Sequence, residues 1–445
     1  MKVSQTDSLP DELCSPPGFI EDLVQHMDET AERRCPELFL AAALCALSVI
    51  VGRKVQDYRG TRPNIYTVSL GTTGAGKNHP RMKLKELFLG THLEGPSKFT
   101  SESAIATALE VSPSRLFQID EFGDYVSLAC NDKASGPLKT AITGLTEIFT
   151  ASAVRWSPNA HANSRNDHEI VQPNLVIHGT TNADDLFCGL TPKQVSSGFV
   201  GRLLVFLSPN GGRNVRRKPF EVLPIPKCVT NFIEAWKQQA CGSSDLSEFN
   251  PDPRKIPIAA DALQRISDHI DGIDERGEDE ERNANALWSR AAEKTSKLAL
   301  LAACSRSAQV IEMMDMNWAI AVTNFLTRRL VALVHNNVAG SDHERKIQRL
   351  LRSVVDGGGV LSLAELSRKT QWLPLRDRKL IVMQMMEAGT LIDVFKQTIT
   401  NPARGVAVNS AAIVNSNWSE ITAADIEQIR AANPSRNRLK DSIKN

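Results

Sequence analysis

A glycine-rich segment, Gly71 to Asn78, is the part of the chain whose residue types point most clearly to chemistry. It reads Gly-Thr-Thr-Gly-Ala-Gly-Lys-Asn, follows an apolar run at Ile65–Leu70 and leads into a helical stretch. Glycines in such a loop let backbone N–H groups turn inward around a phosphate, and the start of the next helix adds a favourable dipole. We therefore predict a phosphate-binding loop whose nucleotide-contacting residues are Gly71, Gly74, Ala75, Gly76, Lys77 and Asn78.

Asn78 departs from the usual form of this loop, which ends in Ser or Thr so that a hydroxyl can bind Mg²⁺. An amide oxygen also ligates Mg²⁺, directly or through water. We expect Lys77 to reach the β- and γ-phosphates of ATP as a point charge, and Asn78 to be one ligand of Mg²⁺. The alternative is a glycine-rich turn that binds no ligand.

A pair of carboxylates, Asp120-Glu121, follows a second apolar run at Leu116–Ile119. Phosphate-binding loops work with such a pair at the end of a second strand, where one acid holds Mg²⁺ and another group orients or deprotonates the nucleophile. We expect Asp120 to hold Mg²⁺, usually through water, and Glu121 to be the general base that polarises the attacking water. An ordinary surface strand end is the alternative.

Apolar runs alternate with helical segments around these motifs. Further runs at Leu175–Ile177 and Leu203–Leu207 continue the pattern, which predicts an α/β fold with buried parallel strands. Residues 18–52 read as two helices that precede this core. The second, Leu38–Gly52, is about 15 residues long and therefore shorter than the ~20 that span a bilayer, so we expect a buried helix.

The composition excludes several classes of protein. The 445 residues include 52 Lys+Arg and 51 Asp+Glu, a net charge of +1, so any contact with nucleic acid must come from local patches. Eight scattered cysteines lack zinc or disulfide spacing, which favours a reduced, cytoplasmic protein. The polar N-terminus has no signal-peptide core, and we expect no membrane partner. The acidic run at 274–281 is predicted to be a solvated loop.

In order and spacing, these motifs resemble those of the AAA+ ATPases. The resemblance is closest to the primase-associated, helicase-like ATPases of phages, plasmids and mobile elements, and more distant to the MCM replicative helicases; it covers residues 9–335. It implies an AAA+ P-loop core with a parallel sheet, an N-terminal helical lead-in, a helical lid and a C-terminal winged-helix domain. The implied domains are a helical region at 1–60, an ATPase core at 61–210, a lid region at 211–339, a winged helix at 340–410 and a tail at 411–445.

The resemblance also implies a sensor residue at the end of the strand that contains Leu175–Ile177. Asn182 is the first candidate to contact the γ-phosphate or the attacking water, and Thr181 is the second. Asn and Thr also favour such places because they cap the helix that follows, which is the alternative explanation.

Two arginines match catalytic positions of the family. Arg202 would be the finger that enters the ATP site of a neighbouring subunit, and the alternative is an ordinary ion-pairing arginine. Arg290 would be a second sensor on the lid helix. The alternative is a purely structural helix, in which Glu293 and Lys297 form an i,i+4 pair on the surface.

A hairpin is predicted at residues 153–170, between the acidic pair and the sensor strand. In MCM-like helicases a hairpin at this place tracks DNA inside a channel. The resemblance therefore implies phosphate contacts by Arg155, His161 and Arg165. Trp156 would stack on a base or, alternatively, pack the root of the hairpin.

Residues 344–408 read as a helix, a helix-turn-helix and two strands, which is the winged-helix pattern. Arg376, Arg378 and Lys379 lie on the candidate recognition helix and would contact DNA. Domains of this kind also serve protein contacts. The tail contains one further predicted helix, Ala423–Ala432.

Three hypotheses for the function follow. The first is an ATP-driven DNA helicase or translocase in replication of a phage or mobile element, a homo-hexameric ring with single-stranded DNA in its channel and a primase or other replication protein as a further partner. The second is a helicase loader, initiator or defence ATPase that remodels a protein without unwinding DNA. The third is a DNA-binding regulator with a degenerate nucleotide site, which only Asn78 supports.

Overall fold

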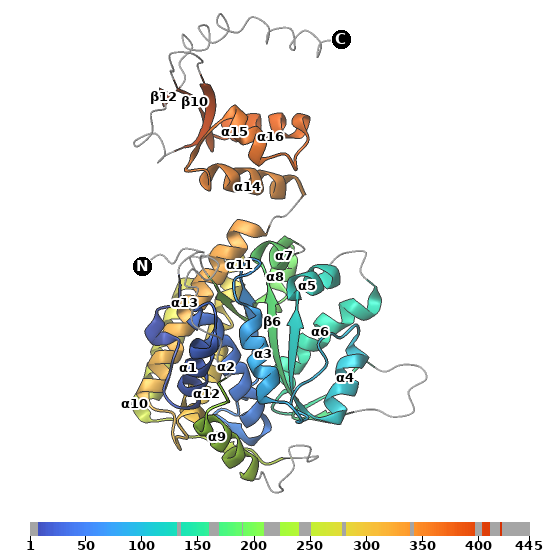
Figure 1. The fold of residues 1–445 in the computed structure, drawn as a ribbon, viewed down its shortest axis with the longest axis vertical. Helices are drawn as coiled ribbons and strands as arrows, with labels where there is room; N and C mark the ends of the chain where they lie inside the picture. The colour runs from blue at the N-terminus through green and yellow to red at the C-terminus, as the bar shows by residue number, and fades with distance from the viewer. Residues whose placement is uncertain are drawn as a thin grey trace, which may run out of the picture. The chain divides into compact units, whose positions relative to one another are not determined.

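The computed structural model describes residues 8–130, 135–159, 169–188, 190–208, 223–239, 251–277, 282–338, 342–396, 403–409 and 419–420. The chain divides into two compact units, 1–338 and 339–445, which we describe separately. Helices predominate, and the main sheet is parallel, so the prediction of an α/β fold with a parallel sheet is confirmed (Figure 1).

The N-terminal unit surrounds its strands with helices. The helices are α1 (Phe19–Thr30), α2 (Pro36–Val51), α3 (Asn78–Leu87), α4 (Glu102–Val111), α5 (Phe122–Cys130), α6 (Gly136–Ala151), α7 (Ala183–Cys188), α8 (Pro192–Ser196), α9 (Lys227–Gln238), α10 (Ala260–Gly277), α11 (Arg282–Trp288), α12 (Ala291–Ser305) and α13 (Met313–Asn337). The strands are β1 (Val55–Gln56), β2 (Tyr66–Leu70), β3 (Ser114–Asp120), β4 (Arg155–Trp156), β5 (Ile170–Val171), β6 (Asn174–Thr181), β7 (Leu203–Leu207) and β8 (Arg254–Lys255).

The main sheet has the order β3-β6-β2-β7, and all of its neighbouring strands are parallel. Tyr66 at the start of β2 lies opposite Ile177 of β6 and Leu203 of β7. Residues 93–95 extend the sheet beyond β3, through hydrogen bonds of 2.7 Å that link Leu116 to Leu93 and Gly95. Because the strands are parallel, the carboxyl ends of β2, β3 and β6 lie at one edge.

Each face of this sheet packs against its own hydrophobic core. Leu116, Val176 and Phe206 belong to the core that contains α1, α2 and α12. Their neighbours Phe117 and Ile177 belong to the core that contains α4, α5 and α6. Strands buried on both faces need apolar residues at successive positions, which explains why they are recognisable in the sequence as continuous apolar runs.

Helix α2 packs across the sheet and contacts all four of its strands. By length and composition alone, the segment Pro36–Lys54 could cross a membrane, with a mean hydropathy of 1.7, but 94% of that window is buried inside the protein. A helix that is apolar all round is expected to be buried, so the prediction of a buried helix is confirmed.

A buried ion pair joins α2 to α13. Glu37, in the first turn of α2, bonds both guanidinium NH₂ groups of Arg329, with Nη2 lying 3.2 Å from Oε2. The same carboxylate accepts the backbone N–H groups of Leu9 at 2.9 Å and of Leu207 at 2.8 Å. Arg329 is 0% exposed and Glu37 is 3% exposed. One carboxylate therefore connects the N-terminal segment, α2, the end of β7 and α13.

The predicted hairpin is present at its root, where Arg155 pairs with Val171 and Trp156 with Ile170 in antiparallel β4 and β5. Its tip, which contains His161 and Arg165, lies outside the described residues. The prediction of a loop at 274–281 was wrong for its start, because α10 continues through Gly277. The buried side chains of Ile266 and Ile273 hold this helix to the core, while Asp274 and Glu275 are exposed.

The described part of the C-terminal unit combines three helices with an antiparallel sheet of order β12-β10-β11-β9. Residues 344–408 contain the predicted helices and strands in the predicted order, with β9 missed because it is three residues long and follows a run of glycines. The predicted helix Ala423–Ala432 lies outside the described residues. The elements are α14 (Asp342–Val355), β9 (Val360–Ser362), α15 (Leu363–Lys369), α16 (Leu375–Glu387), β10 (Leu391–Lys396), β11 (Ala403–Val408) and β12 (Ser419–Glu420).

The Arg329→Met substitution should destabilise the N-terminal unit by about 3–5 kcal/mol, because it leaves the Glu37 carboxylate buried without a counter-charge. Urea unfolding followed by tryptophan fluorescence measures this loss. The control Lys237→Met breaks an exposed pair, in which Lys237 lies 2.6 Å from Glu234, and should cost less than about 1 kcal/mol. A loss in Arg329→Met no larger than that of the control would contradict the importance of the pair.

Candidate functional site

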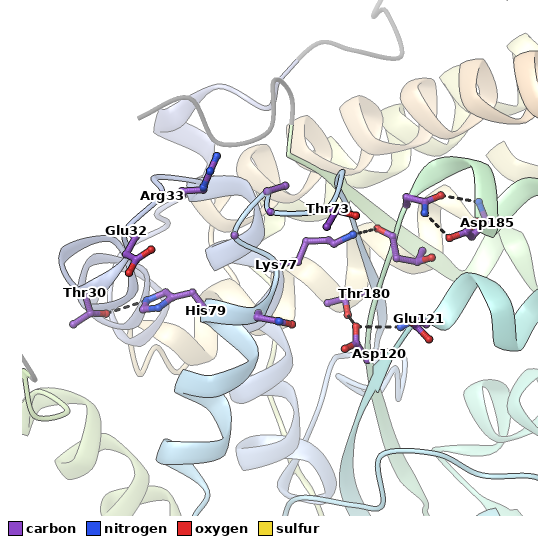
Figure 2. A pocket seen from close by; sticks show the side chains of 16 residues that line it. Thr30, Glu32, Arg33, Thr73, Lys77, His79, Asp120, Glu121, Thr180 and Asp185 are labelled. Carbon is purple, nitrogen blue, oxygen red and sulfur yellow. Dashed lines mark hydrogen bonds between the residues drawn. The ribbon is translucent and has the colours of Figure 1, made fainter. Parts of the chain in front are cut away.

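The carboxyl ends of β2, β3 and β6 open into a cavity of about 720 Å³. This volume lies within the range of small-molecule sites, and the carboxyl ends of parallel strands are where α/β proteins bind their ligands. Figure 2 shows the cavity with Lys77 projecting across it. Its lining residues are Thr30, Glu32, Arg33, Thr73, Gly74, Ala75, Gly76, Lys77, Asn78, His79, Asp120, Glu121, Thr180, Thr181, Asn182 and Asp185.

The glycine-rich loop has the backbone conformation of an anion cradle. Gly74 and Gly76 have φ values of 78° and 87°, in the left-handed region that favours glycine. A Cβ at residue 76 would also come within 3.3 Å of the Arg33 side chain. Among the described residues, no backbone carbonyl accepts the N–H groups of Gly74, Gly76 or Lys77. These donors are therefore available to phosphate oxygens.

Lys77 joins the loop to the end of β6. Its ammonium group donates to the carbonyl oxygen of Gly71 and, at 3.0 Å, to that of Thr181. Burial lowers the pKa of Lys77 below its ordinary value, while the charges of Asp120 and Asp185 act in the opposite direction. Both of its present partners are neutral carbonyls, so an anion in the cavity would offer the ammonium a stronger hydrogen bond.

Asp120 is held by three donors at the end of β3. Its Oδ1 accepts the Thr180 hydroxyl at 2.8 Å and the Glu121 backbone N–H at 3.1 Å, and its Oδ2 lies 2.8 Å from the Arg81 guanidinium. Partial burial on its own would raise the pKa of Asp120. The hydrogen bond from Thr180 and the charge of Arg81 outweigh that effect and hold the pKa below its ordinary value.

Glu121 has a strained backbone, with φ at 53°. Non-glycine residues seldom adopt this region, and strain of this kind concentrates at functional sites. The residue turns the chain from β3 into α5, so its carboxylate projects into the cavity (Figure 2). No described residue donates a hydrogen bond to that carboxylate, which leaves its oxygens free to accept a proton.

The two predicted Mg²⁺ ligands do not fit the metal in their present arrangement. A single Arg81 nitrogen, Nη1, lies 3.2 Å from Asn78 Oδ1 and 2.8 Å from Asp120 Oδ2. Mg²⁺ needs an octahedron of oxygens at about 2.0–2.1 Å, and here a cationic group already lies between the two oxygens. In this arrangement a guanidinium lies where Mg²⁺ was expected.

Asn182 lies on the cavity wall and caps the helix that follows it. Its Oδ1 accepts the backbone N–H of Asp185 at 2.8 Å, and its Nδ2 donates to the Asp185 carboxylate. This is the capping arrangement that was the alternative to a sensor role. The neighbouring Thr181 hydroxyl is buried and has no partner among the described residues, so of the two candidates Thr181 has the uncommitted polar group.

Arg202 lies outside the cavity lining and is only 6% exposed. Its guanidinium donates to the Gly198 carbonyl at 2.8 Å and to the Thr150 hydroxyl at 3.2 Å, and stacks over Phe149 with 5.7 Å to the ring centroid. The pKa of Arg202 is lowered by burial and also by the charge of Arg290. In this conformation the guanidinium binds groups of its own chain.

Arg290 precedes α12 and donates to Glu293 at 3.3 Å; it also lies outside the cavity lining. The alternative prediction for this segment, a pair of Glu293 and Lys297, is present, with the two charged groups 3.9 Å apart. The pair does not lie on the surface as predicted, because Lys297 is 1% exposed. Its ammonium donates to Asn64 at 2.6 Å, and Glu293 lies farther away at 3.9 Å.

The described hairpin residues are divided between surface and core. Arg155 is exposed and pairs with Glu169 at 3.0 Å. Trp156 is 4% exposed, and its indole N–H lies 3.3 Å from the Glu147 carboxylate. Trp156 therefore packs the root of the hairpin, which was the alternative to stacking on a base.

On α16 of the C-terminal unit, Arg376 and Lys379 are exposed. Arg378 instead holds the preceding turn, because its guanidinium donates to the carbonyls of Ser367 at 3.3 Å and Thr370 at 3.4 Å. Of the three predicted DNA contacts on this helix, two are free to meet a ligand and one is committed to the fold.

One wall of the cavity was not predicted. Thr30 at the end of α1, and Glu32 and Arg33 in the link to α2, lie with His79 on the side away from Asp120 and Glu121 (Figure 2). The His79 imidazole is 3.1 Å from the Thr30 hydroxyl. No local motif marks residues 30–33, because only the packing of α1 against α3 brings them to the loop.

Comparisons with known proteins do not assign the chain to a family. No family model matches the sequence, and a search of curated proteins finds no match. Among solved structures, one similar chain is described as the structure of Drosophila ORC bound to DNA; it has 13% identity and a TM-score of 0.17, over 84% of this chain and 90% of that one. A TM-score this low supports no argument about fold or function.

The buried His178 lies on β6, the strand that also positions Thr180, and its titration should make the stability of the protein depend on pH. Burial and, secondarily, the Arg81 charge lower the pKa of His178 to about 3, from 6.5 for a free imidazole. Between these values only the unfolded chain binds the proton, so stability falls as the pH drops below 6.5. From about pH 7 to about pH 5, wild type should lose about 2 kcal/mol more than His178→Gln.

Urea midpoints at the two pH values measure this difference. The control His335→Gln changes an exposed imidazole and should follow wild type. Equal losses in wild type and His178→Gln would show that His178 does not titrate as described.

Proposed function

We propose that the chain is an AAA+ ATPase, the family that its motifs resemble. The observation that carries this proposal is the convergence, at one cavity, of a loop with free N–H donors, Lys77, and the strained acidic residue Glu121. A degenerate nucleotide site would not need to keep a base that is free of hydrogen bonds. The proposed nucleotide is ATP.

In the proposed reaction the loop N–H groups and Lys77 bind the phosphates, with Lys77 exchanging the Thr181 carbonyl for an anionic oxygen. Water attacks the γ-phosphorus, the bond from that phosphorus to the bridging oxygen breaks, and ADP leaves. Glu121 accepts the proton from the water. Thr181, whose hydroxyl lacks a partner among the described residues, would orient the water or the γ-phosphate.

We propose that the hydrolysis drives a cytoplasmic DNA helicase or translocase, active as a homo-hexameric ring around single-stranded DNA, in replication of a phage or mobile element. The antiparallel β4–β5 pair supports a channel hairpin, and the order of α14, α15, α16, β10 and β11 supports a winged helix. Arg202 would act as the finger after leaving its present contacts. A primase is the proposed further partner.

The burial of Arg202 favours a second candidate, an AAA+ switch that remodels a protein partner without unwinding DNA. A finger that is only 6% exposed would need a conformational change before it could reach a neighbouring subunit. A requirement for this conformational change suits a loader or initiator that hydrolyses ATP only when a partner protein changes its conformation.

The Glu121→Gln substitution should abolish ATP hydrolysis, with a loss of about a hundredfold or more, and leave ATP binding within about threefold of wild type. Phosphate release measures hydrolysis, and calorimetric titration measures binding. Lys77→Ala should lose both, because it removes the cation that meets the phosphates. The control Lys85→Ala removes an exposed charge from the same helix and should change neither.

Single-stranded DNA should raise the ATPase rate of wild type, and wild type should separate a forked duplex, while Glu121→Gln should not. If DNA does not stimulate the ATPase and the fork stays intact, the helicase proposal is contradicted and the protein-remodelling switch is favoured. If wild type does not bind ATP, both proposals are contradicted.

Reversing the charges of Arg376 and Lys379 to Glu should weaken DNA binding, because both side chains are exposed on α16. If each contacts one phosphate, the slope of log affinity against log salt should become shallower by about 2. Fluorescence anisotropy over a salt series measures it. The control reverses Lys227 and Lys255, two exposed lysines of the N-terminal unit, and should leave the slope unchanged.

A further inference from the structure

Arg81 lies on α3, one helical turn after Asn78, and its guanidinium is part of the floor beneath the cavity rather than of its lining. Its Nη1 bridges Asn78 and Asp120, at 3.2 Å and 2.8 Å. The Arg81 side chain is 12% exposed, so protein covers most of it, while the side chain of Asp120 is 53% exposed. The structure therefore supplies a positive charge at the two residues where the motif leads one to expect Mg²⁺.

The coordination of Asp120 supports the same conclusion. Oδ1 is occupied by Thr180 and the Glu121 N–H, and Oδ2 by Arg81, so hydrogen bonds engage both carboxylate oxygens. Three of the roughly four lone-pair sites of this carboxylate are therefore engaged, and the donor on Oδ2 is a cation that would repel a metal ion. Asn78 contributes a neutral amide oxygen that already accepts from Arg81, so it adds no charge that would favour a divalent ion.

Electrostatics explains what Arg81 does for an anionic ligand. Without a cation, the Asp120 carboxylate in the cavity wall would repel the phosphates of a nucleotide. Arg81 neutralises that carboxylate from within the chain, as a bound metal would from outside it. Arginine suits this position because it stays charged, and its Nη1 group has two hydrogens that can serve two acceptors.

We propose that Arg81 takes the place of Mg²⁺ in neutralising Asp120, so that the site binds its nucleoside triphosphate as the metal-free anion. This inference rests on the proposed nucleotide site. Arg81 is a positioning residue, since it acts on the ligand through Asp120 and Asn78.

The test measures ATP affinity by calorimetry with the full-length protein, in excess MgCl₂ and in EDTA. Wild type should bind ATP with dissociation constants within about threefold of each other in the two buffers. Arg81→Gln should lose about tenfold to a hundredfold in EDTA, because Asp120 is left uncompensated, and should recover affinity in MgCl₂.

Removing both charges, in Arg81→Gln with Asp120→Asn, should restore binding in EDTA to within about threefold of wild type. A merely structural role for Arg81 would not be reversed by this second change. The control Lys85→Gln removes a charge from the same helix outside the site and should match wild type in both buffers.

Wild type alone decides the question if the variants do not fold. Tight binding in MgCl₂ together with a loss of more than about tenfold in EDTA would overturn the inference while leaving the nucleotide site intact. No binding in either buffer would overturn the proposed function and this inference with it.

Discussion

The buried pair of Glu37 and Arg329 is the interaction on which the arrangement of the site depends. It fixes the start of α2 to the end of β7 and to α13. At the other end of α2, a side chain on Gly52 would collide with Asn174, which bonds the Ser48 carbonyl at 3.1 Å. Between these two ends, α2 contacts all four strands of the sheet. The register of the strands, with Leu70 opposite Thr181 and Asp120 opposite Thr180, places the loop after β2 and the acids at the end of β3 at one edge.

Although the net charge of the chain is only +1, several cationic side chains are buried inside the N-terminal unit. Arg329, Lys294 and Lys297 are each at most 3% exposed, and burial lowers the pKa of both lysines to about 8. Lys297 lies 4.4 Å from the Phe149 ring centroid and donates to Asn64, so it links α12 to the segment before β2. Burying charges is costly unless they are bonded, and each of these has hydrogen-bond acceptors. The net charge of +1 therefore does not reveal that some cations serve the interior of the fold and not its surface.

The features that could be predicted from the sequence are those formed by one continuous segment of the chain. The loop Gly71–Lys77 is one continuous segment, and strands such as β7 are apolar because both faces are covered, so both were found at or near their observed bounds. The cavity wall at Thr30–Arg33 was missed because it depends on how α1 packs, and no residue pattern encodes that contact. Arg202 was located correctly in the chain, yet its burial against Phe149 depends on α6, more than 50 residues earlier.

The contact between Asn78 and Arg81 could have been predicted from the sequence. Residues three apart on a helix face the same side, so Asn78 and Arg81 were placed to meet as soon as α3 was predicted. Asn78 and Arg81 then form one feature, in which the amide oxygen accepts from the guanidinium that also pairs with Asp120. A loop that had merely decayed would not need a matching cation one turn later, nor a strained acid at Glu121 with φ at 53°. The departure at Asn78 is therefore better explained as a change in how the site balances its charge than as loss of the site.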